Sequence, residues 1–239
     1  MYWLDSGSAL GAARHNGFIP WDDDIDIGML RDDYDRFLAV APQALGDRYE
    51  VVDPLSSDRH PAMFAKVWLK GTKFYTVETL DAGVFQGVGI DVMPYDVLSA
   101  DEAVARKQRK NCRLLQMVLY LYHSGRVVVP HRGVLGSVER GACRAAHVVI
   151  QNLYSHERLV EKFQKFALAG LSKPGDTSMC MSYVAIGCFL TKSLIPVTFR
   201  TFEDGKFPVP ADLESYLETM FGNWQELPPV GERRQHDPI

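Results

Sequence analysis

The stretch WDDDIDIG, residues 21–28, places four aspartates within the five positions from Asp22 to Asp26. Neighbouring carboxylates repel one another and each resists burial, so such a run requires a physical reason. Aspartate alternates with isoleucine in its second half, and alternate side chains of a strand share a face. The stretch therefore predicts a half-buried strand with Asp22, Asp24 and Asp26 on its open face.

The spacing of these aspartates favours binding of a cation. Asp24 and Asp26 would lie about 7 Å apart, because each strand residue rises about 3.3 Å. Mg²⁺ prefers oxygen ligands, binds through one or two carboxylates and leaves positions for substrate phosphates. A calcium-binding EF-hand loop does not fit, because Ile27 stands where that loop requires glycine. The simpler alternative is a solvated acidic turn.

Other parts of the chain supply the remaining groups that phosphate chemistry needs. GIDVMP, residues 89–94, predicts a neighbouring strand that adds Asp91 as a third carboxylate. Gly7 and Ser8 leave the first strand and open a helix, where free backbone N–H groups and the helix dipole form a cradle for phosphate. The cations predicted to hold phosphate are Arg14, Lys66, Arg233 and, in the same basic tail, Arg234 and His236.

Composition limits the class of protein. The chain has 239 residues, a net charge of -4 and 46% hydrophobic residues, which suits one globular domain with a sizeable core. The chain is not strongly basic, so its composition does not suggest nucleic-acid binding. No apolar run approaches the roughly 20 residues of a transmembrane helix. The four cysteines lack zinc-ligand spacing and are predicted to be reduced thiols.

The hydrophobic pattern predicts an α+β fold. Strands dominate residues 1–95, with one strand ending near Pro94 and two others meeting around Gly71. Residues 100–170 are predicted to form a helical insertion, and residues 173–176 a turn. Residues 201–210 carry a hairpin signal, and residues 212–222 are predicted to form a capped helix. We therefore expect a single domain, 1–239, with a mixed β-sheet core, flanking helices and this insertion.

Three segments resemble the LicD family, which includes the fukutin-related proteins. They are YWLDSGSALGAARHNGFIPWDDDIDIGMLRDDYDRF (2–37), GVGIDVMPYD (87–96) and FEDGKFPVPADLESYLETMFGNWQELPPVGERR (202–234). The chain departs from the family at Ser8-Ala9-Leu10, where Leu-Leu commonly follows the hydroxyl residue, and at Gly222-Asn223, where Gly-Asp is common. A family helix normally packs behind the first strand, so we expect a segment to precede residue 1.

The resemblance implies a nucleotidyltransferase-type fold and transfer of a substituted phosphate from a CDP-linked alcohol, such as CDP-choline or CDP-ribitol, to a sugar hydroxyl of a glycan. It also implies Mg²⁺ or Mn²⁺ held by Asp24 and Asp26, with Asp22 beside them. Asp91 would complete the metal site or accept the proton of the attacking hydroxyl. Donor phosphate would lie at Gly7 and Ser8.

Two other functions use the same residues. A nucleotidyltransferase would move the nucleoside monophosphate itself and release pyrophosphate, and a degenerate domain would bind a glycan without turnover. The resemblance places a bacterial protein in the cytoplasm and an animal one in the Golgi.

Overall fold

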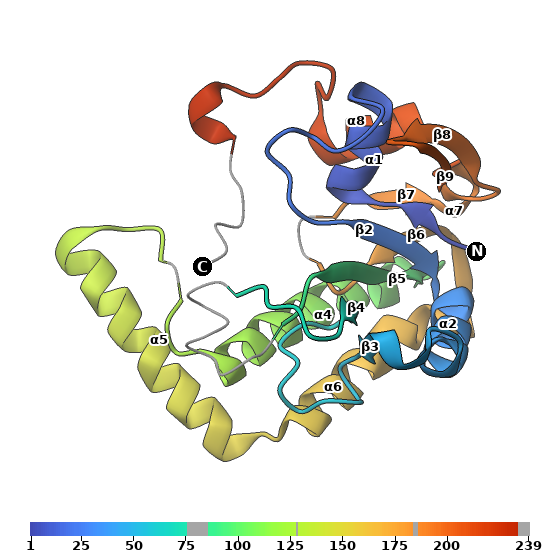
Figure 1. Ribbon diagram of the computed structural model, residues 1–239. Helices are drawn as coiled ribbons and strands as arrows, with labels where there is room; N and C mark the ends of the chain where they lie inside the picture. Colours follow the sequence, from blue (N-terminus) through green and yellow to red (C-terminus); the bar gives the residue numbers. More distant parts are fainter. Residues whose placement is uncertain (76–85, 128, 184–185, 234–239) are drawn as a thin grey trace.

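The computed structural model describes residues 1–75, 86–127, 129–183 and 186–233 (Figure 1). The strands are β1 (Trp3–Leu4), β2 (Asp26–Leu30), β3 (Tyr49–Val52), β4 (Ala65–Leu69), β5 (Gly89–Ser99), β6 (Pro174–Cys180), β7 (Cys188–Leu190), β8 (Thr198–Phe202) and β9 (Gly205–Val209). The α-helices are α1 (Ser6–Arg14), α2 (Arg31–Ala44), α4 (Glu102–His123), α5 (Gly133–Leu153), α6 (His156–Ala167), α7 (Thr191–Leu194) and α8 (Leu213–Phe221). Short 3₁₀ turns are η1 (Gly46–Arg48), η2 (Leu168–Ser172) and η3 (Val230–Glu232).

Strand β5 is the centre of a mixed sheet. The strands follow the order β1-β2-β5-β4-β3, and β6 and β7 extend from the second half of β5. The β2–β5 pair is parallel, whereas the other pairs of this sheet are antiparallel. A separate hairpin, β8–β9, lies beside β1 and α1 (Figure 1). The predicted α+β fold with a mixed sheet is confirmed.

Some predicted boundaries were wrong, and each has a local cause. Strand β5 does not end near Pro94 but continues to Ser99. On the side of β5 that faces β4 and β6, β4 pairs with β5 only as far as Val92, and the pairing with β6 begins at Tyr95. Pro94 lies between these two stretches, so its missing N–H interrupts no pairing. The turn predicted at 173–176 is instead the start of β6. A second strand was predicted beyond Gly71, over residues 72–80. Residues 72–75 have no regular secondary structure, and residues 76–80 lie outside the described residues.

The acidic stretch also begins its strand later than predicted. Strand β2 starts at Asp26, and Asp22 to Ile25 precede it without regular secondary structure. The neighbouring strand β1 ends at Leu4 because Asp5 caps the N-terminus of α1, so the register between β1 and β2 ends at the pair of Leu4 and Ile27. Asp22 and Asp24 therefore lie on an approach to the strand rather than on its face.

Two hydrophobic clusters hold the chain together. One joins the sheet to α1 and α8 around Trp3, Val92 and Leu217, and the other joins α4 and α6 to Leu98 at the end of β5. Helices α4 to α6 confirm the helical character of 100–170, and the division of the chain into one domain with an insertion stays a prediction. Among the described helices none is long and apolar enough to cross a membrane. All four cysteines are free thiols.

Candidate active site

An acidic row crosses three adjacent strands of the sheet. Asp26 of β2 is the register partner of Asp91 of β5, and Asp91 is the register partner of Lys66 of β4. The Lys66 Nζ lies 2.7 Å and 3.0 Å from the two carboxylate oxygens of Asp91. Directly paired residues share a face of a sheet, so the three side chains open onto the same side. The structure thus brings together residues that the sequence placed on separate predicted strands.

The negative charge of this row exceeds its positive charge. Burial raises the pKa of the Asp26 carboxyl well above its ordinary value, and the charges of Asp24 and Asp91 raise it further. Asp5 adds to this effect, whereas Lys66 lowers the pKa of Asp26. A cation placed among these carboxylates would relieve their repulsion, and carboxylate oxygens are the ligands that Mg²⁺ prefers. In the described part of the chain, however, no three His, Cys, Asp or Glu side chains are gathered closely enough to hold a metal ion.

The start of α1 lies against this acidic segment. The buried Ser8 hydroxyl accepts a hydrogen bond from the Asp26 N–H at 3.0 Å, which fixes the start of β2 to the helix. A Cβ atom on Gly7 would lie 2.5 Å from a carboxylate oxygen of Asp22, so glycine permits this close approach. The first N–H bonded within the helix is that of Ala9. The Gly7 and Ser8 amides therefore belong to the first turn, where helix N–H groups lack intrahelical acceptors.

A pocket of about 540 Å³ borders the first turn of α1. Residues from both ends of the chain line it, among them Gly7, Arg14, Trp21, Asp22, Trp224 and Pro229. Arg14 Nη1 donates to the backbone carbonyls of Trp224 at 2.8 Å and Glu226 at 3.2 Å. The Nε of Arg14 is buried and has no hydrogen-bond partner among the described residues. Within the described part of the chain, the buried Nε donor of Arg14 is thus unsatisfied beside the pocket.

A second cation lies close to the same pocket. The Arg233 guanidinium lies 4.5 Å from the centre of the Trp21 ring, within the range of a cation–π contact. Burial lowers the pKa of Arg14, and the charge of Arg233 lowers it further. Two arginines therefore lie near each other beside an aromatic ring. Arg234 and His236, predicted to join them, lie outside the described residues.

The acidic segment separates this pocket from a second one of about 250 Å³. Asp22 lines the first pocket, whereas Asp23 and Asp24 line the second. Lys66, Trp68 and Asp91 also line the second pocket. The carboxylates thus lie at the boundary between a cavity with two arginines and a cavity on the open face of the sheet.

Two further residues of this region were not predicted from the sequence. Asp5 is fully buried and accepts hydrogen bonds from the hydroxyls of Tyr95 at 2.9 Å and of Tyr216, which ties α1 to β5 and α8. An aspartate directly before a helix is a capping signal that could have revealed it. Burial raises the pKa of Tyr183, and the charges of Asp26 and Asp24 raise it further. Tyr183 stands in a stretch that reads as plain core, so no pattern pointed to it.

Comparison with known proteins identifies the first part of the chain. Residues 1–97 match the family model described as LicD/FKTN/FKRP, nucleotidyltransferase domain. The chain is 27% identical to the lipopolysaccharide cholinephosphotransferase LicD of Haemophilus influenzae over 253 aligned positions, which cover 98% of this chain and 86% of that protein.

Two further similarities are short. An uncharacterised protein of Rickettsia typhi is 52% identical over 42 residues, covering 18% of this chain and 14% of that protein. The human ribitol 5-phosphate transferase FKRP is 59% identical over 32 residues, covering 13% of this chain and 6% of that protein. The acidic row lies within the matched region, and the pocket at α1 combines residues of that region with residues 221–229. Residues 1–97 are therefore similar to the nucleotidyltransferase domain of the LicD family, and the likeness to a LicD protein extends over nearly the whole chain.

Proposed function

We propose that this chain is a LicD-type phosphotransferase that moves a substituted phosphate, such as phosphocholine or a polyol phosphate, from a CDP-linked donor to a sugar hydroxyl of a glycan. The names of its relatives, a cholinephosphotransferase and a ribitol 5-phosphate transferase, support transfer of a phosphate group. The observation that carries the proposal is the Asp26–Asp91–Lys66 row, whose Asp91 and Lys66 line one pocket, together with the adjoining Asp22–Asp24 segment, which borders both that pocket and the pocket at α1.

The larger pocket suits the donor. A diphosphate is strongly anionic, and first-turn amides together with arginines are the groups that bind such anions in proteins. Gly7 and Ser8 supply the amides, and Arg14 and Arg233 supply the charge. Trp21, already in contact with Arg233, offers an aromatic face for the base of the donor. Binding here would hold the diphosphate beside Asp22 and the acidic row.

The residues that would hold Mg²⁺ or Mn²⁺ are Asp24, Asp26 and Asp91, with Asp22 adjacent, and their side chains would have to draw closer together around the cation than they lie in the structure. Their oxygen chemistry fits such a cation, and the surplus charge around Asp26 favours binding one. A bound cation would neutralise charge that develops on the phosphoryl oxygens.

The chain's own groups position the reactants. Lys66 holds the Asp91 carboxylate in place, and the same carboxylate can orient the attacking hydroxyl or accept its proton. A carboxylate beside a cation is a weak base, so positioning supplies most of the rate. The hydroxyl attacks the phosphorus that carries the alcohol substituent, the bond to the bridging oxygen breaks, and CMP leaves. The products are a phosphodiester-linked glycan and CMP.

Product analysis tests this proposal. The chain is incubated with CDP-choline or CDP-ribitol, Mg²⁺ or Mn²⁺, and an oligosaccharide from bacterial lipopolysaccharide, and nucleotides are separated by chromatography. We expect CMP release that requires acceptor and metal. Cytidine triphosphate or another nucleoside triphosphate with the same acceptor tests the nucleotidyltransferase alternative, because that reaction releases pyrophosphate. Pyrophosphate release without CMP, or metal and sugar binding with no turnover of any donor, would overturn the assignment.

A further inference from the structure

The open face of the sheet continues beyond the acidic row to the edge strand β3. Lys66 is the register partner of Val52, and Trp68 is the register partner of Glu50. Residues two apart on one strand share a face, so Trp68 lies on the same side as Lys66. The face that carries Asp91 therefore also carries an indole and a further carboxylate at its edge.

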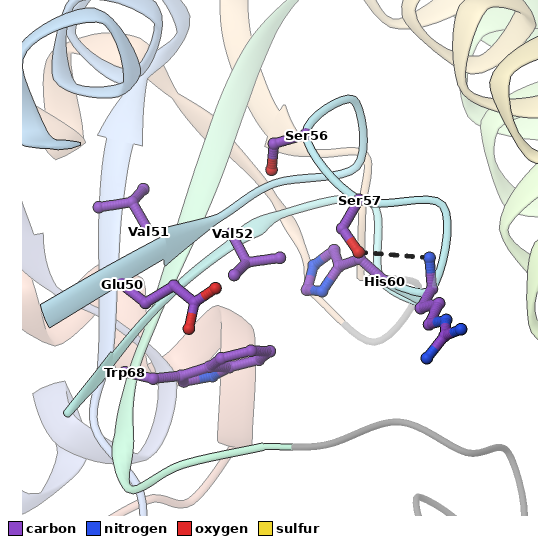
Figure 2. Close-up of a pocket in the computed structure, with 8 residues that line it drawn as sticks. Glu50, Val51, Val52, Ser56, Ser57, His60 and Trp68 are labelled. Atoms are coloured by element: carbon purple, nitrogen blue, oxygen red, sulfur yellow. Dashed lines mark hydrogen bonds between the residues drawn. The ribbon is translucent and has the colours of Figure 1, made fainter. Parts of the chain in front are cut away.

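A pocket of about 320 Å³ lies on this edge. Its walls come from β3, β4 and the segment that connects them, and Figure 2 shows the Trp68 indole extending beneath Val52 toward the imidazole of His60. The residues that matter here are Glu50, Val52, Ser57, Arg59, His60 and Trp68. Trp68 also lines the cavity that holds Asp24 and Asp91. One side chain thus forms a wall shared by the edge pocket and the active-site cavity.

His60 gives this pocket a built-in acceptor. Its side chain is 1% exposed, and its Nε2 lies 2.7 Å from the Phe64 carbonyl oxygen. A carbonyl only accepts, so Nε2 carries the proton and Nδ1 of the neutral ring is an acceptor. Burial lowers the pKa of His60 to about 4, which keeps the ring neutral near pH 7. Nδ1 is buried and has no hydrogen-bond partner among the described residues, so it requires a donor.

The chemistry of the pocket fits a neutral ligand with many hydroxyl groups. His60 Nδ1 and the Glu50 carboxylate accept hydrogen bonds, and Arg59 and the Ser57 hydroxyl donate them. The indole of Trp68 offers an apolar surface for the C–H face of a sugar ring. A phosphate group fits less well, because Glu50 would repel it. This combination of an aromatic face with a few placed polar groups is typical of a specific small-ligand site.

We propose that the edge pocket binds a sugar unit of the glycan acceptor, next to the unit whose hydroxyl receives the phosphate. The inference rests on the proposed function, because it treats the Asp91 side of the sheet as the acceptor side. Two strand spacings separate Asp91 from Val52, about 10 Å in total, which a disaccharide can bridge. The pocket wall is also anchored from behind, since His156 Nε2 donates to the Pro54 carbonyl at 2.7 Å.

The first test measures sugar binding without turnover. Ligand-detected NMR is recorded for the full chain with methyl β-galactoside, methyl β-glucoside and lactose, in the absence of donor. We expect saturation transfer to the sugars that falls severalfold in Trp68→Ala and Glu50→Gln and is retained in Trp68→Phe. Glu214→Gln, an exposed change on α8, is the matched control. Equal signals in wild type and Glu50→Gln, or no binding of any sugar to wild type, would overturn the proposal even if Trp68→Ala fails to fold.

The second test separates the edge pocket from the active site. With a disaccharide acceptor, Glu50→Gln, a change at a residue that lines the edge pocket and not the active-site cavity, is expected to raise the acceptor KM about tenfold, the factor that corresponds to one hydrogen bond to a charged group. The KM for a monosaccharide acceptor and the KM for the donor should stay unchanged. A loss that is equal for both acceptors contradicts the proposal. Absence of turnover in wild type together with sugar binding at this pocket would overturn the proposed function alone.

Discussion

Strand β5 carries two aspartates whose surroundings differ in charge balance. Asp96 is 1% exposed and binds Arg31 through two hydrogen bonds, Nε to Oδ1 at 2.7 Å and Nη2 to Oδ2 at 3.0 Å. Asp91 is partly exposed and pairs with Lys66, whose charge also lowers the pKa of a neighbouring carboxyl group, Asp26. The two aspartates are five positions apart along the strand, an odd number, so they fall on opposite faces of the strand. One carboxylate is neutralised by its own arginine, and the other belongs to a group with surplus negative charge.

This difference distinguishes a structural acid from a functional one. A buried carboxylate with a matched bidentate arginine needs nothing more, and its removal leaves an uncompensated charge. A group of carboxylates with one lysine destabilises the fold slightly but favours binding of a cation. Folded chains accept such a cost mainly at functional sites. Stability and turnover measured on the same variants separate the two cases.

The largest expected effect concerns the structural acid. Asp96→Asn should lower the free energy of unfolding by about 3–5 kcal/mol, because Arg31 would remain buried without its anionic partner. Urea unfolding followed by circular dichroism measures this change. Asp91→Asn, which breaks the more exposed pair with Lys66, is the matched comparison and should change stability by less than about 1 kcal/mol. Equal losses in the two variants would erase the distinction.

Turnover should show the reverse order. Asp91→Asn is expected to reduce metal-dependent CMP release on the order of 100-fold, the usual cost of removing a key electrostatic group from an active site. Asp47→Asn, an exposed aspartate in η1, should retain wild-type turnover. Near-normal rates in Asp91→Asn would remove this carboxylate from the proposed site.

The same difference separates an arginine that has an ion-pair partner from arginines that have none among the described residues, and its expected effect is smaller. Arg31 forms an ion pair with Asp96. Arg14 and Arg233 each donate to a backbone carbonyl, and Arg233 also contacts the Trp21 ring, but neither makes an ion pair in the part of the chain that the structure describes. Arg233→Ala should therefore raise the donor KM about tenfold while stability stays within about 0.5 kcal/mol. Arg200→Ala, an exposed change on β8, serves as control. An unchanged donor KM would place Arg233 outside the donor pocket.

The smallest expected effect is an increase in the free energy of unfolding. Asp26→Asn should raise the free energy of unfolding by about 1 kcal/mol at pH 7 in metal-free buffer, since it removes a buried charge that its neighbours repel. The pKa of Asp26 is raised on folding, so its ionisation costs stability as pH rises above the unfolded value of 3.8. The gain should therefore grow from pH 4 to pH 7. A loss of stability at pH 7 would mean that Asp26 is structurally required.

The sequence predicted the acidic residues of the site but not which cations pair with them. Asp91 and Asp96 both stand among apolar residues of one strand, and only the register with Lys66 and the reach of Arg31 from α2 separates them. Such contacts depend on tertiary packing, which local patterns do not encode. Ser8 illustrates the same limit: its hydroxyl accepts a hydrogen bond from the Asp26 N–H, a contact that no local pattern predicts, while its amide stays a predicted phosphate ligand.

Motifs with strong local signals were predicted more completely. The hairpin β8–β9 and helix α8 follow from Asp204-Gly205 and from the caps Asp212 and Gly222, whose chemistry acts within a few residues. The edge pocket had no such signal. Its residues come from two strands and their connection, and Trp68 and His60 each read as ordinary core residues in isolation.

Binding of Mn²⁺ tests the central claim most directly. Paramagnetic resonance counts free Mn²⁺ during titration of the wild-type chain and of Asp24→Asn, Asp26→Asn, Asp91→Asn and Asp47→Asn. The surplus negative charge at the acidic row predicts one site in the wild type and in Asp47→Asn, weakened at least tenfold in each of the other three variants. Equal affinity in all five proteins, or no binding to the wild type with CDP-choline present, would contradict a cation site on this face of the sheet.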